Sequence, residues 1–445
     1  MGLTAVRLGV QVGGTFPENA TLNVEYLDRI EEIVDSLWNA GIATILDMHQ
    51  DVFSSNICGE GFPNWMVSLS DLHSMEFPRP ISLSGSKPNP ENNTWTPVVP
   101  CSPTGLLKFI GWSEFYMTDA CGKAFQGLYD NTSVVAKMVN AHWDAVSKRF
   151  AGHDGVLAYE MLNEPWIGDY ISHPELLLEG GKAEKETVGP FMERIHAIIR
   201  KNDQDTPIMY APAEVNNRAM RSVGYEDGFL AGEPMAFHTY CITGTDSAGP
   251  TTPATIELCH FNDDFQLNTR EKDLKRLHTA GFITEFGAVN DVPTGMDEVR
   301  FVCDHMDKMN PPISWTFWDH NLVFGDVCCF FSLSLSFYDT HTHLHTNTQQ
   351  ANYEKELSRA YPRAVAGEIE SFSFDAKTSD FTLSYVTGKA LETTEVFLGT
   401  AFYTNGTNVE VSPESCCDVK NAGNGVLLIT HHESDVSVSV KVSSL

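Results

Sequence analysis

Long apolar runs are absent from this chain of 445 residues. No stretch reaches the roughly eighteen apolar residues that a bilayer requires, so the sequence predicts no membrane-spanning segment. None of the ten cysteines belongs to a CxxC pair, so we expect no zinc site. Basic residues are also scarce, with 29 Lys and Arg against 59 Asp and Glu. The formal net charge of −30 disfavours nucleic acid and anionic lipid as partners, whereas a neutral substrate would not be repelled.

Four N-glycosylation sequons favour a secretory origin. They start at Asn19, Asn92, Asn131 and Asn405, and together with the ten cysteines they are typical of an oxidising compartment. We therefore expect a secreted or lysosomal protein. The first ten residues contain no signal peptide, so the alternatives are a cytosolic protein or a chain whose start is missing.

Apolar runs of strand length alternate with helical patterns over most of the chain. Leu27, Ile30, Val34 and Leu37, for example, recur at helical spacing between two such runs, which is the pattern of a βαβ unit. The strand-like runs lie at residues 3–10, 42–47, 156–164, 207–210, 235–240, 281–287 and 313–318. These runs predict an α/β fold of the (β/α)8 TIM-barrel type. We infer that the first βα unit is absent, which leaves the barrel incomplete at its N-terminus.

The pattern changes after residue 362. Short alternating strands separated by turn residues fill 363–445 and predict a C-terminal antiparallel β-sandwich domain, so we expect a catalytic barrel over 1–362 and this second domain after it. The stretch 328–348 is an atypical insertion of low complexity. Its alternate histidines, His341, His343 and His345, could bind a metal on one strand face, but a disordered insertion or translated non-coding sequence fits the composition better.

Two of the predicted strands end in glutamate. Glu164 lies within Asn163-Glu164-Pro165, and Glu285 lies within Thr284-Glu285-Phe286. Because a barrel places the carboxyl ends of its strands at one rim, the two carboxyl groups can serve as acid/base and nucleophile on a glycosidic bond. We expect Glu164 to be the acid/base with a raised pKa, and Glu285 to be the ionised nucleophile. Asn163 can bond the 2-hydroxyl of the sugar.

Polar residues inside other apolar strands are candidates for the same site. A buried Arg7 needs a carboxylate partner, and pairing with Glu285 would keep that group ionised; a structural ion pair elsewhere is the alternative. Tyr240 can donate its hydroxyl to Glu285. His238, two residues earlier, points to the same face, and a hydrogen-bonded core histidine is the alternative for it.

Candidates for sugar binding come from two further strand ends. His49 and Asp51 belong to the run Asp47-Met-His-Gln-Asp-Val-Phe53, and their donors and acceptors suit sugar hydroxyls. Trp318 offers a flat face on which a pyranose can stack, although aromatic residues are more often part of the core.

These motifs resemble those of glycoside hydrolase family 5 and, within it, the endoglycoceramidases. Asp47–Phe53 is similar to their strand-three signature, Met161–Pro165 to their acid/base motif, Ile283–Gly287 to their nucleophile motif and His238–Tyr240 to their strand-six pair. The resemblance covers about residues 3–327 and the β-sandwich after 350. Family members also carry a first strand near the sugar site and a shorter connection in place of 328–348.

The resemblance implies a retaining enzyme that cuts the β-glucosidic bond between an oligosaccharide and ceramide, without a metal or cofactor. It implies an apolar groove for the lipid, for which Phe53, Phe62, Trp65 and Trp166 are candidate walls. We further expect peripheral contact with lipid membranes or micelles, and a monomer. The alternatives are another family-5 enzyme, such as a β-glucosidase or an endoglucanase, and a catalytically inactive glycolipid-binding relative.

Overall fold

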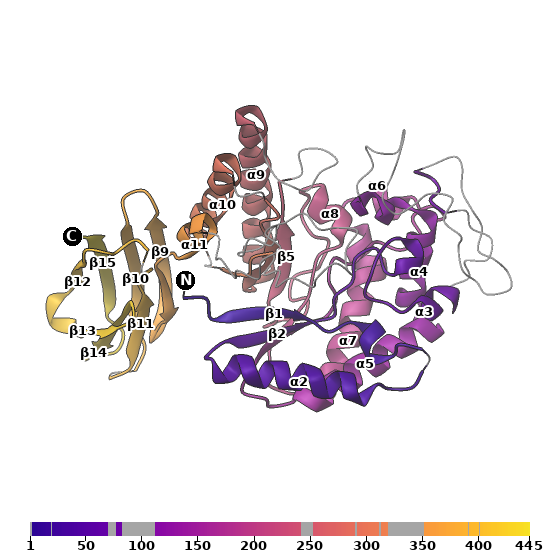
Figure 1. Ribbon diagram of the computed structural model, residues 1–445, viewed down its shortest axis with the longest axis horizontal. Coiled ribbons are helices and arrows are strands. Elements are labelled where there is room, and N and C mark those ends of the chain that lie inside the picture. Colours follow the sequence, from indigo (N-terminus) through magenta and orange to yellow (C-terminus); the bar gives the residue numbers. More distant parts are fainter. Residues whose placement is uncertain are drawn as a thin grey trace, which may run out of the picture. The chain divides into compact units, whose positions relative to one another are not determined.

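The protein divides into two compact units. The computed structural model describes residues 2–18, 20–69, 77–81, 112–241, 252–289, 292–310, 313–318, 351–389, 391–399 and 401–445 (Figure 1). The N-terminal unit comprises Thr4–His238 and Lys272–Thr284, and the C-terminal unit comprises Met1–Leu3, Thr239–Glu271 and Glu285–Leu445. The predicted insertion at 328–348 lies outside the described residues, as does its histidine series.

Parallel strands form the centre of the N-terminal unit. A four-stranded sheet has the order β1-β2-β3-β4, with β1 at Ala5–Gly9, β2 at Ala43–Asp47, β3 at Val156–Glu160 and β4 at Ile208–Met209. The register pairs Gly9 with Asp47, Asp47 with Glu160, and Glu160 with Met209. The carboxyl ends of all four strands therefore lie at one edge, which is where barrel enzymes place their chemistry.

A second sheet has the order β5-β6-β7, with β5 at Met235–Thr239, β6 at Gly281–Phe286 and β7 at Ser314–Trp315. A parallel bridge between Tyr210 and Met235 continues the first sheet towards β5. The division into units falls after His238 in β5 and after Thr284 in β6. The described residues thus contain the seven strands that the apolar runs predict, and the barrel-type fold is confirmed.

One apolar side chain from each of five successive strands fills the interior of the N-terminal unit. These residues form a single buried cluster: Ile45, Ala158, Met209, Ala236 and Phe282. Inward-pointing residues on neighbouring strands that pack in a layer are the core of a β/α barrel.

Helices surround these strands. Those with most or all of their residues in the N-terminal unit are α1 (Val12–Thr15), α2 (Val24–Asn39), α3 (Asn64–Leu69), α4 (Asp119–Tyr129), α5 (Val134–Phe150), α6 (Glu175–Leu178), α7 (Gly189–Asn202) and α8 (Glu214–Arg218). Short turns of other helix types are η1 (Ser55–Ile57), η4 (Trp112–Met117) and the π-helical η5 (Glu184–Val188). Figure 1 shows α2 running alongside β2.

Local sequence explains the limits of α2. The side chain of Asn23 caps its start by accepting the amide of Tyr26. Leu27, Ile30 and Val34 are buried on one face. Gly41 follows the end of the helix in the left-handed region, with φ +79°, which a glycine adopts without strain.

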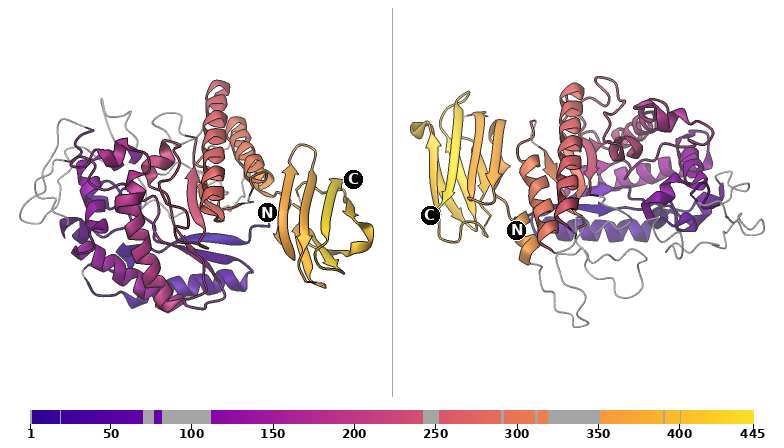
Figure 2. Two further views of the ribbon diagram at one scale, coloured as in Figure 1. Left: turned by 180° about the vertical axis from the view of Figure 1, so that it is seen from behind. Right: turned by 90° about the horizontal axis from the view of Figure 1, so that it is seen from above.

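The C-terminal unit contains α10 (Pro293–Met306), α11 (Ala351–Leu357), most of α9 (Pro253–Leu277) and a β-sandwich. Its two antiparallel sheets have the orders β12-β15-β10-β9 and β13-β14-β11-β8 (Figure 2). The strands are β8 (Tyr361–Ala364), β9 (Gly367–Asp375), β10 (Asp380–Thr387), β11 (Thr393–Phe397), β12 (Thr407–Ser412), β13 (Cys417–Gly423), β14 (Val426–His431) and β15 (Ser437–Ser444).

Alternating apolar residues hold the sandwich together. Phe381, Leu383 and Tyr385 of β10, for example, pack against Ile429 of β14 and Val440 of β15 in one cluster. The C-terminal antiparallel sandwich is confirmed. Among the described helices of the whole chain, none combines the length and apolar character needed to cross a bilayer.

Candidate active site

The turn after β3 holds Glu164 in a strained conformation. Its φ is +40°, in the left-handed region that costs a residue with a side chain about 1–2 kcal/mol. Gln50 stabilises this turn, because its Nε2 donates to the carbonyls of Asn163 at 2.8 Å and of Glu164 at 3.2 Å. The Oε1 of Gln50 accepts the amide of Phe53 in turn. Strain that is held in place by buried hydrogen bonds marks this turn as a functional position.

The carboxyl group of Glu164 lies among cationic partners. Its Oε1 is 2.9 Å from Nδ1 of His238, and its Oε2 is 3.5 Å from Nη2 of Arg218. Burial opposes ionisation of this carboxyl, but the hydrogen bond to His238 and the charges of His238, Arg218 and His49 overcome it and lower the pKa of Glu164 to about 2. The expected raised pKa is therefore wrong for the substrate-free protein, because the sequence did not show how many cations face this group.

His238 connects two strand ends. Its Nε2 lies 3.1 Å from Oγ1 of Thr284, and its Nδ1 bonds Glu164 as described above. Thr284 also donates to Oε1 of Glu160 at 3.0 Å. His238 is thus both buried and hydrogen-bonded, and it contacts the proposed acid/base directly.

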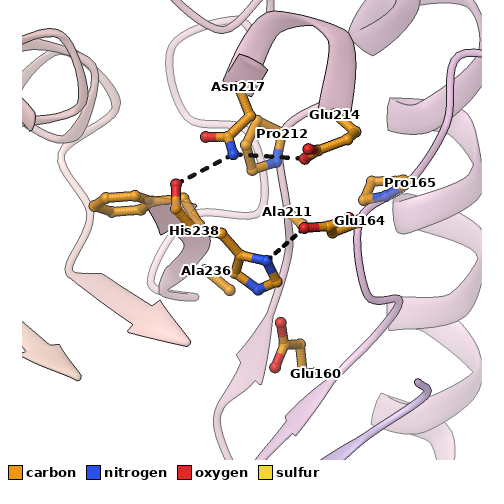
Figure 3. A pocket seen from close by; sticks show the side chains of 10 residues that line it. Glu160, Glu164, Pro165, Ala211, Pro212, Glu214, Asn217, Ala236 and His238 are labelled. Carbon is orange, nitrogen blue, oxygen red and sulfur yellow. Dashed lines mark hydrogen bonds and ion pairs between the residues drawn. The ribbon is translucent and has the colours of Figure 1, made fainter. Parts of the chain in front are cut away.

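A small pocket opens beside Glu164. Its cavity volume is about 10 Å³, which is at the lower limit of the space that one water molecule needs. Five polar side chains line it: Glu160, Glu164, Glu214, Asn217 and His238. Figure 3 shows the carboxyl groups of Glu164 and Glu214 pointing into the same space, above Glu160.

Arg7 is buried among carboxylates. Its Nε lies 2.5 Å from Glu160, and its Nη2 lies 3.0 Å from Asp47 and 2.8 Å from the amide oxygen of Asn163. The general expectation that Arg7 needs a carboxylate partner is confirmed. The particular pairing with Glu285 stays a prediction.

The candidates for sugar binding after β2 form one polar cluster. Nδ1 of His49 is 2.8 Å from Asp47, and its Nε2 is 3.4 Å from Asp51. Burial favours the neutral ring of His49, but the two aspartates raise its pKa well above the usual value. Asn163 donates to the carbonyl of Gln50 at 2.8 Å and reaches Asp51 at 3.4 Å. His49, Asp51 and Asn163 therefore present a fixed set of donors and acceptors.

The same cluster contains a possible cation site. His49, Asp51 and Glu60 offer ligand atoms that all lie within 4.8 Å of one another. Acidic groups gather in this way in many proteins that hold no ion, and the contacts of His49 with Asp47 and Asp51 account for its position. We assign no metal here.

Glu285 has its own partner in the C-terminal unit. It is 5% exposed, and the hydroxyl of Tyr240 donates to its Oε2 at 2.6 Å. The expected contact between Tyr240 and Glu285 is confirmed.

Trp318 lies at the end of the neighbouring strand. Its amide donates to the carbonyl of Phe286 at 2.9 Å, and its carbonyl accepts the amide of Ala288 at 3.2 Å. Gly287 permits this approach, since its φ is +115° and a Cβ there would lie 2.9 Å from the carbonyl oxygen of Trp318. Trp318 itself is half-buried.

Several residues of the site escaped the sequence analysis. Gln50 and Thr284 hold other site residues in place, Glu160 pairs with Arg7, and Glu214 and Arg218 on α8 border Glu164. A signal existed for Glu160, because an acidic residue inside an apolar strand is as costly as Arg7 inside another.

Most of the residues that the sequence analysis proposed as walls of a lipid groove are buried. Phe53 and Phe62 are 0% and 4% exposed and stack on each other with ring centroids 4.1 Å apart. Trp166 is 2% exposed, and Trp65 is half-buried with its Nε1 donating to the carbonyl of Phe16. Phe53, Phe62 and Trp166 therefore belong to the core and do not line an open groove.

Buried glutamates after parallel barrel strands, each with a dedicated hydrogen-bonding partner, define the class of barrel glycosidases. The family model for cellulase (glycosyl hydrolase family 5) matches residues 1–322, and the model for the glycoside hydrolase family 5 C-terminal domain matches residues 359–442. The chain belongs to glycoside hydrolase family 5.

Similar proteins agree with this assignment. The endoglycoceramidase of Cyanea nozakii is 29% identical over 453 residues, covering 100% of this chain and 82% of the relative. That of Hydra vulgaris is 30% identical, covering 93% and 73%. The structure of endo-glycoceramidase II from Rhodococcus sp. superposes with a TM-score of 0.74 at 21% identity, covering 100% of this chain and 90% of that one. At this identity the likeness concerns the fold.

Proposed function

We propose that the protein is a retaining endoglycoceramidase, which hydrolyses the β-glucosidic bond between the oligosaccharide and the ceramide of glycosphingolipids. The observation that carries the proposal is the pair of buried glutamates, Glu164 bonded by His238 and Glu285 bonded by Tyr240. The relatives named endoglycoceramidase, which match most of this chain, support the substrate class.

Each glutamate has one role in this proposal. A carboxylate oxygen of Glu285 attacks the anomeric carbon while the bond to the ceramide oxygen breaks, and Glu164 gives its proton to that oxygen. Glu164, now ionised, takes a proton from water, and the water oxygen displaces Glu285 from the sugar.

The polar residues around the glutamates receive supporting roles. We assign Asn163 to the 2-hydroxyl of the sugar, and His49 and Asp51 to its other hydroxyls. Trp318 stacks on the pyranose, and His238 and Tyr240 hold the two carboxyl groups. Arg7 fixes Asn163 through the bond to its amide oxygen.

The substrate implies a lipid surface. Ceramide tails stay in micelles or bilayers, so we propose that the enzyme works as a monomer in peripheral contact with them. The net charge of −30 favours surfaces without a strong negative charge of their own. We also propose a secretory or lysosomal compartment, supported by the disulfide between Cys241 and Cys259 and by two exposed sequons, Asn131 and Asn405.

A second candidate is a family-5 β-glucosidase or endoglucanase. The family model that matches residues 1–322 is described as cellulase, and a glucosylceramidase of Rhizopus delemar is 27% identical over 173 residues. Such an enzyme would release glucose or cut a glucan chain.

Hydrolysis of a ganglioside in detergent micelles tests the proposal. We expect release of the intact oligosaccharide together with ceramide. Glu164→Gln and Glu285→Gln should each lower kcat by ~1000-fold or more, because each removes a group that acts in the transition state. Glu226→Gln, which changes an exposed glutamate, is the matched control and should leave kcat unchanged.

Other products would overturn the assignment. Glucose as the only sugar released would favour the β-glucosidase. Glycolipid binding without any turnover would favour an inactive relative. Turnover that persists in both glutamine variants would mean that other carboxyl groups do the chemistry.

A further inference from the structure

The short helix α8 is tied to the turn that carries Glu164. The amide of Glu214 donates to the carbonyl of Pro165 at 2.9 Å, and Nδ2 of Asn217 donates to the carbonyl of His238 at 3.1 Å. Helix α8 is therefore attached to both sides of the contact between Glu164 and His238 (Figure 3).

Buried bonds fix the start of α8 from behind. Glu184 accepts the amide of Ala213 at 3.2 Å and the side-chain amide of Asn216 at 2.8 and 2.7 Å. Glu184 is 1% exposed and Asn216 is 1% exposed, so these bonds are shielded from water. The side chains of α8 consequently have little freedom to change position.

One guanidinium group serves two carboxyl groups. Nε of Arg218 lies 2.6 Å from Glu214, and its Nη2 lies 3.5 Å from Glu164. The same guanidinium lies over the ring of Tyr116, 5.4 Å from its centroid. Glu214 is 4% exposed and Glu164 is 8% exposed, so the nearby cation favours the ionised form of both buried carboxyl groups.

Glu214 holds a proton more readily than Glu164. Burial and the charge of Glu164 raise the pKa of Glu214 to about 7, although Arg218 and His238 act in the opposite direction. Two carboxyl groups close to one cation thus have proton affinities that lie far apart, which is how enzymes separate acid from base. The acid/base must nevertheless be protonated at the start of the reaction and ionised later.

We propose that Glu214 and Arg218 are positioning residues that set the proton affinity of Glu164 in opposite directions. Arg218 favours the carboxylate of Glu164. In its ionised form Glu214 opposes it, both by repulsion and by drawing the guanidinium to itself, so that Glu164 can take up the proton that it delivers to the leaving oxygen. This inference rests on the proposed function of Glu164.

Other titratable groups also face Glu164 and stay the same in every variant considered below. They include His238 from β5, His49 after β2, Glu160 at the end of β3 and Tyr116 from η4. Because they do not change between variants, differences between the pH profiles report on α8 alone.

The pH dependence of kcat tests the proposal. Its alkaline limb reports the proton on the acid/base in the enzyme–substrate complex. Glu214→Gln should move this limb to lower pH by about one unit, because Arg218 then acts on Glu164 alone. Arg218→Met should move it to higher pH by about one unit, because the carboxylate loses a nearby cation. Arg218→Lys keeps the charge and should leave the limb close to that of the unchanged enzyme.

Two further measurements separate this idea from a merely structural role. A β-glycoside with a dinitrophenolate leaving group needs no protonation, so its alkaline limb should not follow the variants. Titration of the Glu164 carboxyl by 13C NMR, assigned with Glu164→Gln, should give the same order of pKa values without turnover. Even if the protein cuts no glycolipid, this titration can therefore support or contradict the proposed effects of Glu214 and Arg218 on the pKa of Glu164.

Shifts in opposite directions for Glu214→Gln and Arg218→Met, in the profile and in the titration, are the expected result. Limbs that stay in place, or that move in the same direction in both folded variants, would overturn the proposal.

Discussion

Buried charges in the N-terminal unit depend on a few specific partners. Arg7 is surrounded by Asp47, Glu160 and Asn163, with 4% of its side chain exposed. Removing one member of such a group leaves the others charged and dehydrated, which costs more than the pair itself contributes.

Arg7→Met should therefore destabilise the protein by about 3–5 kcal/mol, because Asp47 and Glu160 lose their cation. Urea unfolding at neutral pH measures the difference. Arg29→Met is the matched control, since the ion pair of Arg29 with Glu32 has 75% and 62% of the two side chains exposed and should contribute less than about 1 kcal/mol. Equal losses in the two variants would contradict the account.

The sequence predicted contacts between individual side chains only where both residues lie at the ends of predicted strands. Tyr240 and Glu285 were paired correctly because both follow apolar strands at the same rim. Gln50, Glu214 and Arg218 were missed, because their contacts with the turn of Glu164 depend on loops whose course no periodicity reveals. The low pKa of Glu164 was missed for the same reason.

Helices and strands could be predicted from the sequence where their burial leaves a clear hydrophobic pattern. The apolar runs predicted β1 to β7, since strands buried on both faces read as continuous apolar segments. In the sandwich, β12 and β13 lie at sheet edges. Most residues of β13 are exposed, so the hydrophobic alternation that identifies a strand is weak there.

Helices α9 and α10 meet through an acid pair. Burial and the neighbouring Asp263 raise the pKa of Glu298 to about 10. The unfolded chain releases this proton near pH 4.5, so the stability that the protonated group provides is fully present below that pH and is lost as the pH rises towards 10.

Glu298→Gln should remove this dependence, because an amide resembles the protonated acid and does not titrate. We expect the variant to gain stability relative to the unchanged protein between pH 5 and pH 8.5, by up to ~1.4 kcal/mol per pH unit. Urea unfolding at several pH values measures the slope. Glu257→Gln on α9, which changes an exposed carboxylate, should keep the original slope.

The whole molecule is strongly acidic and carries exposed sequons in each unit. Asn131 lies in the N-terminal unit and Asn405 in the C-terminal unit, and both are exposed. The fold class could be predicted from the sequence because alternating strands and helices are global features. The family was indicated by short motifs, and the family model that matches residues 1–322 confirms it. The domain boundary at residue 362 stays a prediction.

Expression through a eukaryotic secretory pathway should add glycans at Asn131 and Asn405. Peptide N-glycosidase should then lower the apparent mass, and the double change Asn131→Gln and Asn405→Gln should abolish the part of the shift that these two sites contribute. Protein made in a bacterial cytosol is the control without glycans. A secreted product that carries no glycan at either site would count against the proposed compartment.

The π-helical turn η5 makes the position of Glu184 sensitive to the deletion of a single residue. Gly189 bonds through its amide to the carbonyl of Glu184, and a Cβ on Gly189 would lie 2.2 Å from that oxygen. Such a turn contains one residue more than an α-helical turn. A single-codon deletion within Glu184–Val188 would restore the ordinary helical register and rotate Glu184 by about 100°, away from Ala213 and Asn216. A homologous protein with a deletion in this turn would lose the support that Glu184 gives to α8. Its catalysis would change although every residue that touches the sugar stays the same.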